Sequence, residues 1–482
     1  MKTTPIIGLE VHVELKTKSK MFCGCSADHF HVEPNTHTCP VCLGLPGALP
    51  VPNKTACEWC LKLGLALGCT VNEESFFERK NYFYPDLSKG YQITQLQKPF
   101  TINGKIEIDG HEIRINRAHM EEDTGKSVHV NGETLLDFNR SGVPLVEIVS
   151  EPDIQSAEEA KKYLNKLQQI IRYIGVSDAD IEKGSMRCEP TVNVKIETDS
   201  GETVYTPLAE IKNVASLTGV MNAINFEIKR QIDEYQSNGI TKNSTNKTTR
   251  GWDADKNQTF LQREKEGSAD YRYFPEPDIP PITFTKDQIE EIRKTLPELP
   301  EVKIARYKNV YALSEYDSQT IASDSNFASH YESIINAYTD ESKIKNFAKF
   351  VANLVLGALK NYLDEVQKTT LIPSNPTFYI NLFDAVSKSE ISVTVAKQVI
   401  VESYQSNKDP VEIAKEKNLI QVSDTGALEE FAKEVIAANP KAVEDYRKNP
   451  LAIGFLVGQL MKISKGSANP QTGKEILEKL LK

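Results

Sequence analysis

The chain has 482 residues, of which 39% are hydrophobic and 26% charged, and its net charge is -10. This composition is that of an ordinary globular protein with two to four domains, and it excludes a protein coated in nucleic acid. No apolar stretch approaches the roughly 20 residues of a transmembrane helix, and the N-terminus lacks the apolar core of a signal peptide. We therefore expect a cytoplasmic protein with no membrane partner.

Residues 6–15 alternate between apolar and polar side chains, which predicts a β-strand with one apolar face. The polar face presents Glu10, His12 and Glu14 in a row. Two carboxylates on either side of an imidazole are typical of a metal site or of acid–base chemistry. We expect Glu14 to be solvated, and we take Glu10 and His12 as candidate site residues.

Four of the eight cysteines form two closely spaced pairs in the next segment. The pairs have the spacings C-x-C and C-P-V-C, and their members are Cys23, Cys25, Cys39 and Cys42. Two such pairs joined by a loop predict a tetrahedral zinc site, which we expect to be structural because it cross-links a loop that has little core of its own. The other four cysteines are assigned to the core: Cys57, Cys60, Cys69 and Cys188.

Two segments interleave cations with aromatic residues. Residues 79–86 have the sequence RKNYFYPD, and residues 270–275 have the sequence DYRYFP. Such stretches can stack on bases and hold phosphates. An aromatic core with a few exposed charges is the alternative, which the spacing alone favours.

An acidic cluster at residues 121–123 precedes the tripeptide Gly-Lys-Ser at 125–127. The first glycine of a phosphate-binding loop would fall at Met120, so the backbone cannot wrap a phosphate in the usual way and we reject that motif. The carboxylates of Glu121 and Glu122 instead suit a divalent cation that bridges nucleotide phosphates. A solvated turn is the other interpretation of this cluster.

The stretch from Leu136 to Asp153 predicts a buried strand that contains one glutamate. In the sequence LDFNRSGVPLVEIVSEPD, Glu147 is flanked on both sides by aliphatic residues, which are Leu145, Val146, Ile148 and Val149. Burying a lone carboxylate costs several kcal/mol unless it is paired or coordinates a metal. We therefore expect the protein to use the charge of Glu147.

The later part of the chain predicts helices. Residues 157–174 carry an apolar stripe typical of a helix, whereas the polar stretch 236–258 is expected to be a loop or an insertion. From residue 286 onward the pattern is helical, with apolar stripes at 344–358 and at 428–435. The last of these helices is expected to end before Asn439-Pro440.

We therefore expect a multidomain α+β protein. Its predicted parts are a mixed α+β domain at 1–285 with antiparallel sheet, an all-helical domain at 286–406 and a small helical tail domain at 407–482. The tail is locally basic, which suits nucleic acid, although it is also compatible with ordinary surface lysines on a packing domain. From Arg447 to Lys482 the cations are Arg447, Lys448, Lys462, Lys465, Lys474, Lys479 and Lys482, against Glu475 and Glu478.

Seven segments resemble the B-subunit family of the aspartyl/glutamyl-tRNA(Asn/Gln) amidotransferases. They occur in the expected order: IIGLEVHVEL, CPVCLGLPGALPVPN, RKNYFYPD, HMEEDTGKS, LDFNRSGVPLVEIVSEPD, DYRYFPEPD and AIGFLVGQLMKISKGSANP. The resemblance covers nearly the whole chain and is weakest at residues 236–262. It implies a cradle domain built on antiparallel sheet, a helical domain and a tail domain that binds tRNA.

The resemblance also implies a reaction. Misacylated Glu-tRNA(Gln) or Asp-tRNA(Asn) has its side-chain carboxylate phosphorylated by ATP, and ammonia then converts the acyl phosphate into an amide. Two partners are implied. The A subunit is an amidase (glutaminase) that releases the ammonia from glutamine, and a small C subunit joins the other two.

Several positions match residues that bind metal in this family. Glu10, His12 and Glu147 match three magnesium ligands, and Glu122 fits the fourth position better than Glu121. The paired cysteines match a zinc site that some members of the family carry. The implied contacts to phosphate or to the tRNA end are Arg79, Lys80 and Arg140.

Two other functions compete with this one. The chain could be a non-catalytic tRNA-binding scaffold whose carboxylates are structural, but such a scaffold gains nothing from a charge at Glu147. It could also be a free-standing zinc hydrolase. Four cysteines would saturate the zinc and leave no position for a water molecule, which argues against a hydrolase.

Overall fold

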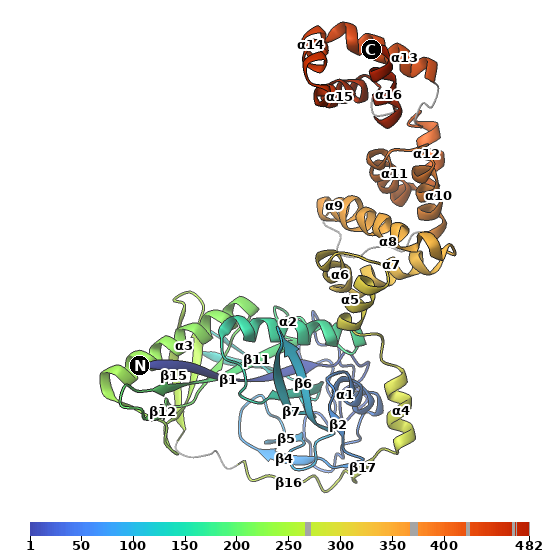
Figure 1. The fold of residues 1–482 in the computed structure, drawn as a ribbon. Helices are drawn as coiled ribbons and strands as arrows, with labels where there is room; N and C mark the ends of the chain where they lie inside the picture. Colours follow the sequence, from blue (N-terminus) through green and yellow to red (C-terminus); the bar gives the residue numbers. More distant parts are fainter. Residues whose placement is uncertain (266–270, 367–374, 421–424, 465–467, 469, 482) are drawn as a thin grey trace. The chain divides into compact units, whose positions relative to one another are not determined.

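A computed structural model describes residues 1–265, 271–366, 375–420, 425–464, 468 and 470–481 (Figure 1). The chain divides into two compact units, Met1–Leu299 and Pro300–Lys482. The first combines sheets with helices and the second is helical, which confirms the multidomain α+β class. The three domain boundaries expected from composition stay a prediction.

A ten-stranded mixed sheet is the main feature of the first unit in the part of the chain that the structure describes. All of its neighbouring strands are antiparallel except β13 and β14, and β12 pairs with β11 beside the main order. From one edge to the other the strands are β15 (Gln258–Lys265), β14 (Lys247–Asp253), β13 (Ala209–Lys212), β11 (Met186–Glu197) with β12 (Thr203–Tyr205), β1 (Lys2–Glu14), β10 (Pro144–Ser150), β7 (His111–Glu122), β6 (Thr101–Ile108) and β2 (Thr70–Val71).

One face of this sheet is apolar and packs against three helices, α1 (Lys54–Ala66), α2 (Ala157–Ile174) and α3 (Leu217–Asn238). Val11 of β1 and Ile148 of β10 are opposite each other and fully buried. Burying such a side chain contributes roughly 1.5–3 kcal/mol. Because side chains alternate along a strand, the same pattern directs every second residue to the opposite, polar face.

Helix α2 has the bounds that the sequence predicts. Ser156 accepts a hydrogen bond from the backbone N–H of Glu159 and begins the helix, and Gly175 ends it with a left-handed backbone at φ 76°. Serine is favoured at the start of a helix because its side-chain oxygen accepts a backbone hydrogen bond. Glycine is favoured at the end because it adopts a positive φ without steric strain. The four cysteines assigned to the core are also confirmed as buried.

Three small sheets complete the first unit. They are β16 (Phe274–Pro275) with β4 (Glu78–Asn81) and β5 (Tyr91–Thr94), β17 (Ile282–Thr283) with β3 (Glu74–Ser75), and β8 (Lys126–Val130) with β9 (Glu133–Asp137). Phe274 pairs with Arg79 across β16 and β4. The two segments that interleave cations with aromatics are therefore neighbours in space.

The predicted loop at residues 236–258 is wrong in part. Helix α3 extends to Asn238, and Lys247–Asp253 forms β14, which pairs with β13 and β15. The segment is polar because the strand lies next to the sheet edge, where Trp252 is the one large apolar side chain among its buried residues, Thr249, Gly251 and Trp252. Backbone hydrogen bonding to its neighbours, which composition does not reveal, makes it a strand.

The first helix after residue 286, α4 (Lys286–Lys294), belongs to the first unit, and the following helices form the second. Those are α5 (Pro300–Asn309), α6 (Glu315–Ala322), α7 (Ser325–Asn336), η1 (Glu341–Lys343), α8 (Ile344–Asn353), η2 (Leu354–Leu359), α9 (Lys360–Glu365), α10 (Pro376–Ser387), α11 (Val393–Ser406), α12 (Pro410–Glu416), α13 (Thr425–Ala438), α14 (Pro440–Lys448), η3 (Pro450–Ala452), α15 (Ile453–Ile463) and α16 (Pro470–Leu481). Helix α13 ends before Asn439, as predicted. No helix among the described residues is long and apolar enough to span a membrane.

Helix α7 contains a buried histidine that predicts acid sensitivity. Burial lowers the pKa of His330 to about 4, and its Nε2 lies 3.1 Å from the Tyr379 hydroxyl. The unfolded chain takes up a proton near pH 6.5, so stability is full above that pH and falls as the pH drops toward 4. We expect the local stability of α7 to be about 2 kcal/mol lower at pH 5.0 than at pH 7.5. Hydrogen exchange of the α7 amides measures this, and a His330→Gln variant should lose most of the difference; an equal difference in that variant would contradict the assignment.

Candidate active site and metal centre

The polar face of the large sheet gathers the candidate site residues. His12 of β1 is opposite Glu147 of β10, and Glu147 is opposite His119 of β7. Arg187 of β11 lies on the other side of His12. Residues that are paired in this way share a face of the sheet, so the four side chains form one row.

Three side chains, two in this row and one beside it, lie close enough together to bind the same metal ion. The Nε2 atom of His12 is 3.3 Å from Glu147 Oε2 and 3.8 Å from Glu121 Oε2. One ligand atom from each of these three residues falls within 4.8 Å of the others. His119 is also near, with its Nε2 3.7 Å from Glu121 and 3.8 Å from Glu147. Two carboxylates and an imidazole suit a divalent cation that keeps several water molecules.

Glu121 occupies the place at this cluster that the resemblance assigns to Glu122. The two are neighbours in β7 and therefore point to opposite faces of the sheet. Glu122 forms an ion pair with Lys89 at 2.6 Å and accepts a hydrogen bond from the backbone N–H of Ile93. Its carboxylate is thus bound within the protein and is not part of the cluster with His12.

Glu10 lies one position further along the polar face, between Val149 of β10 and Glu189 of β11. It is not one of the three residues that meet within 4.8 Å. Burial raises the pKa of Glu10, and the negative charges of Glu147, Glu210 and Glu189 raise it further. A carboxyl with a raised pKa beside the cluster is suited to exchange a proton.

Two cations approach the carboxylates of the cluster. Lys80 Nζ is 4.0 Å from Glu121 and 5.3 Å from the ring of Tyr271, and Arg117 lies 3.8 Å from Glu147. Glu121 also accepts hydrogen bonds from Thr94 at 2.8 Å and from Gln92 at 3.0 Å. The site is therefore a preorganised arrangement of opposite charges.

The other two cations predicted to contact phosphate have partners inside the protein. Arg79 forms a two-pronged ion pair with buried Glu276, at 2.6 and 2.9 Å, and stacks over Tyr91. Arg140 donates to the backbone carbonyls of Thr124 and Gly125 at 3.0 and 2.8 Å. Lys80 alone of the three predicted cations lies at the cluster.

The charges around the cluster shift the pKa values of its members in opposite directions. Burial opposes ionisation of Glu147, but the imidazoles of His119 and His12 and the ammonium of Lys80 hold the pKa of Glu147 well below its usual range. Burial likewise disfavours the charged imidazole, but a hydrogen bond to Glu147 and the surrounding carboxylates raise the pKa of His12 to about 9. Without a metal, His12 and Glu147 therefore form an ion pair at neutral pH. A divalent cation would take the place of the His12 proton.

The prediction that Glu14 is solvated is wrong. Glu14 is 6% exposed and its Oε2 lies 2.9 Å from His29, a residue of the cysteine-rich segment. Arg187 approaches it at 3.8 Å and donates to Asp123 at 2.6 Å. The loop that carries the cysteines covers this end of the strand, which the alternation within β1 alone does not reveal.

The four paired cysteines converge, as their spacing predicts. One sulfur atom from each of Cys23, Cys25, Cys39 and Cys42 lies within 4.8 Å of the others, and Cys39 and Cys42 are 3.9 Å apart at sulfur. Tetrahedral zinc, with Zn–S bonds of about 2.3 Å, separates its sulfur ligands by about 3.8 Å. A hydrogen bond from the Cys23 thiol, aided by the Cys39 backbone N–H and the charge of Lys20, lowers the pKa of Cys42, which favours binding of a metal through this sulfur. The donor set fits zinc.

Two family models match this chain, one in its N-terminal part and one in its C-terminal part. Residues 5–290 match the model of a GatB/GatE catalytic domain, and residues 330–481 match that of a GatB domain. The chain is 45% identical over 487 residues to the B subunit of the aspartyl/glutamyl-tRNA(Asn/Gln) amidotransferase of Persephonella marina, covering all of both chains. The proteins with the same name from Carboxydothermus hydrogenoformans and Thermotoga petrophila are 45% and 42% identical, over 99% and 100% of this chain and 98% and 99% of their own.

The chain belongs to the GatB/GatE family. It is a subunit of a tRNA-dependent amidotransferase, which is a ligase, and the match confirms the family that the seven segments indicated. The polar-face cluster lies wholly within the residues that match the GatB/GatE catalytic domain.

Two residues at the site of this GatB/GatE chain, His119 and Arg117, are not among the candidates that the sequence suggests. Both precede Glu121 with the spacing of alternate residues in a strand, and β7 extends through all three. Interpreting residues 121–123 as an isolated acidic cluster conceals this alternation. A strand assignment for residues 111–122 would have placed all three side chains on one face.

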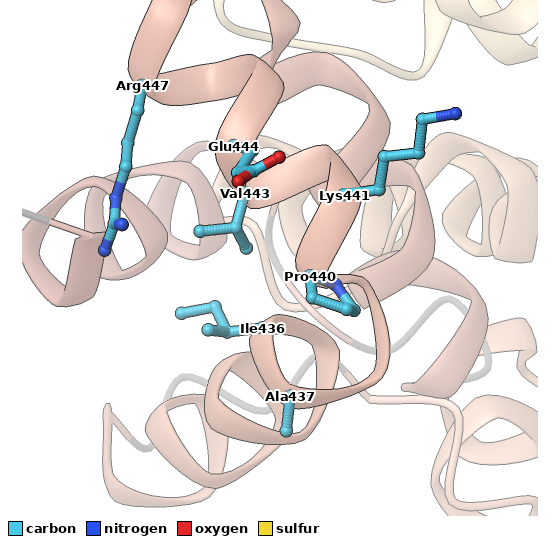
Figure 2. A pocket seen from close by; sticks show the side chains of 7 residues that line it. All are labelled: Ile436, Ala437, Pro440, Lys441, Val443, Glu444 and Arg447. Carbon is cyan, nitrogen blue, oxygen red and sulfur yellow. The ribbon is translucent and has the colours of Figure 1, made fainter.

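The basic tail of this GatB/GatE chain is partly neutralised within the structure. Lys474 lies 3.8 Å from Glu478, and Lys479 lies 3.8 Å from Glu429. Lys465, Lys482 and the side chain of Lys448 lie outside the described residues. An open pocket of about 610 Å³ is lined by Arg447 and six neighbours, and Figure 2 shows Ile436 and Val443 facing each other while the ammonium of Lys441 extends away.

Proposed function

We propose that this chain phosphorylates the side-chain carboxylate of misacylated Glu-tRNA(Gln) or Asp-tRNA(Asn) with ATP and then amidates it with ammonia. The observation that carries this proposal is the cluster of His12, Glu121 and Glu147 on the polar face, in residues that match a catalytic domain. The names of the relatives supply the two amino acids and the two tRNAs.

The chemistry needs two displacements at one place. A carboxylate oxygen of the aminoacyl group attacks the γ-phosphorus of ATP and releases ADP, which turns a poor electrophile into an acyl phosphate. Ammonia then attacks the acyl carbon, inorganic phosphate leaves, and the nitrogen loses a proton. The first step depends on positioning and on neutralising the charge of the phosphoryl group. Glu10, whose raised pKa lies nearer neutrality, is the proposed acceptor of the proton.

We assign the cluster to magnesium. His12, Glu121 and Glu147 would hold the ion, with Glu10 beside them and Glu121 in place of Glu122. Magnesium supplies charge neutralisation between the phosphate oxygens of ATP. Lys80, which is 4.0 Å from Glu121, is the cation we propose to contact phosphate or the tRNA end.

We assign the four-cysteine centre to structural zinc. The spacing of its sulfur atoms supports that metal, and four thiolates leave no open coordination position for a substrate. The centre holds the loop that carries His29 against Glu14, at the edge of the polar face.

The proposed partners are those that the family resemblance implies, and the name of the relatives as a B subunit supports a complex of several subunits. An amidase, the A subunit, would release ammonia from glutamine, and a small C subunit would join it to this chain. The helical tail, with Lys441, Arg447 and Lys462, is the part that we propose to contact tRNA. A non-catalytic tRNA-holding scaffold is the second candidate, and the buried charge of Glu147 argues against it.

The test uses the assembled complex in which the amidase has been inactivated by mutation. We expect it to form ADP and Gln-tRNA from ATP and Glu-tRNA when ammonium chloride replaces glutamine. Because the amidase step is then absent, both products report on the chemistry of this chain. Formation of neither product, in a complex that binds Glu-tRNA and ATP, would contradict the proposal and favour the scaffold.

A further inference from the structure

A lysine lies fully buried beside the four-cysteine centre. Lys20 is 0% exposed, and its backbone is fixed by a hydrogen bond from its own N–H to the carbonyl of Cys25 at 3.0 Å. The side-chain amide of Asn53 donates a hydrogen bond to the backbone carbonyl of Lys20 at 3.3 Å. The position of this side chain is therefore set by the fold.

The ammonium of Lys20 has three acceptors, one for each of its hydrogens. Two are the backbone carbonyls of His37 at 2.7 Å and Phe138 at 3.2 Å, and the third is the sulfur of Cys42 at 3.6 Å. Among the residues that the structure describes, no carboxylate lies within 4.0 Å of it. The sulfur of Cys42 is thus the one group in contact with Lys20 that can carry a negative charge.

A buried ammonium needs a counter-charge, and the four-cysteine centre can supply one. Zinc with four thiolates carries a net charge of 2−, whereas the same cysteines as neutral thiols carry none. The metal-loaded centre therefore needs a nearby cation, and Lys20 needs a nearby anion. The two requirements are met most fully when zinc is bound.

We propose that Lys20 is the counter-charge of the zinc centre and raises the affinity of the centre for zinc. The inference rests on the zinc assignment proposed above. Hydrogen bonds to ligand atoms from outside the coordination sphere commonly change metal affinity by about 10- to 100-fold. Coupling of this kind is reciprocal, so zinc also compensates the buried charge of Lys20 more fully than the metal-free cysteines do.

The test compares zinc affinity in four forms of the full chain: wild type, Lys20→Met, Lys20→Arg and Lys18→Met. Methionine has a similar length without the charge, arginine keeps the charge, and exposed Lys18 is the matched control two residues away. Competition with a chromophoric chelator at pH 7.5 should show zinc binding weakened about 10- to 100-fold in Lys20→Met. Lys18→Met should be unchanged, and Lys20→Arg should lie closer to wild type than Lys20→Met.

A second measurement separates charge compensation from loss of folding. Thermal unfolding of the metal-free forms should show Lys20→Met at least as stable as wild type, while zinc should stabilise wild type more than Lys20→Met. Equal zinc affinity in wild type and Lys20→Met, or equal weakening in Lys20→Met and Lys20→Arg, would overturn the role of Lys20. A wild type that binds no zinc, and shows no thiolate-to-cobalt charge-transfer band with Co²⁺, would instead overturn the zinc centre itself.

Discussion

Replacing Glu147 with glutamine should lower the rate of ADP formation by roughly 100- to 1,000-fold, because it removes one of the two negative charges in the cluster of His12, Glu121 and Glu147. Glu147 contacts His12 at 3.3 Å and lies near Arg117 and His119. Glutamine has nearly the same shape, so the strand and its apolar neighbours should stay in place. Single-turnover ADP formation in the ammonium-driven assay measures the effect.

The matched control for this variant is Glu197→Gln. Glu197 lies at the far end of β11, where it is opposite Lys2, and its partner Lys195 is half-exposed. We expect this variant to keep the wild-type rate. The Glu147→Gln complex should still bind Glu-tRNA; wild-type activity in that variant would make Glu147 structural and would restore the scaffold as the leading function.

Of the two adjacent glutamates, only Glu121 should affect metal binding when it is changed to glutamine. We expect Glu121→Gln to weaken Mn²⁺ binding by at least about 100-fold, because it removes one of the two proposed carboxylate ligands. Glu122→Gln should leave Mn²⁺ affinity within about threefold of wild type, since Glu122 is paired with Lys89 on the opposite face. Electron paramagnetic resonance of free Mn²⁺ gives both affinities.

Each of these two variants is the control for the other, because they are adjacent in β7 and have the same chemistry. Glu122→Gln should instead lower thermal stability, since it leaves the 11%-exposed ammonium of Lys89 without its anion. Loss of Mn²⁺ binding in Glu122→Gln, with retention in Glu121→Gln, would reverse the assignment and restore the ligand set that the resemblance implies.

Local patterns were sufficient to predict several parts of this molecule. The spacing of the cysteines predicts the centre that the structure forms, because ligands from two short pairs need little knowledge of the fold. The apolar strand around Glu147 predicts that the charge of Glu147 has a partner or a ligand, and the structure places His12 beside this carboxylate. Both predictions depend on residues that are close together in the sequence.

Other features depend on strand pairing, which the sequence does not display. Glu121 and Glu122 are equally acidic, and only their alternation within β7 and its pairing with β10 show which one meets His12. Glu14 is buried by a loop that folds back over its strand. No pattern in the sequence shows that Lys20 is buried, because the exposed Lys16 and Lys18 precede it at the same two-residue spacing.

The most direct test of the metal cluster is an anomalous difference map from crystals of this chain grown with Mn²⁺ in place of Mg²⁺. We expect one strong peak within about 2.5 Å of His12 Nε2 and of one oxygen from each of Glu121 and Glu147. The peak should be lost in crystals of Glu121→Gln. Crystals that show no peak on the polar face at millimolar Mn²⁺, or show one at Glu122 instead, would contradict the site proposed for phosphorylation and amidation.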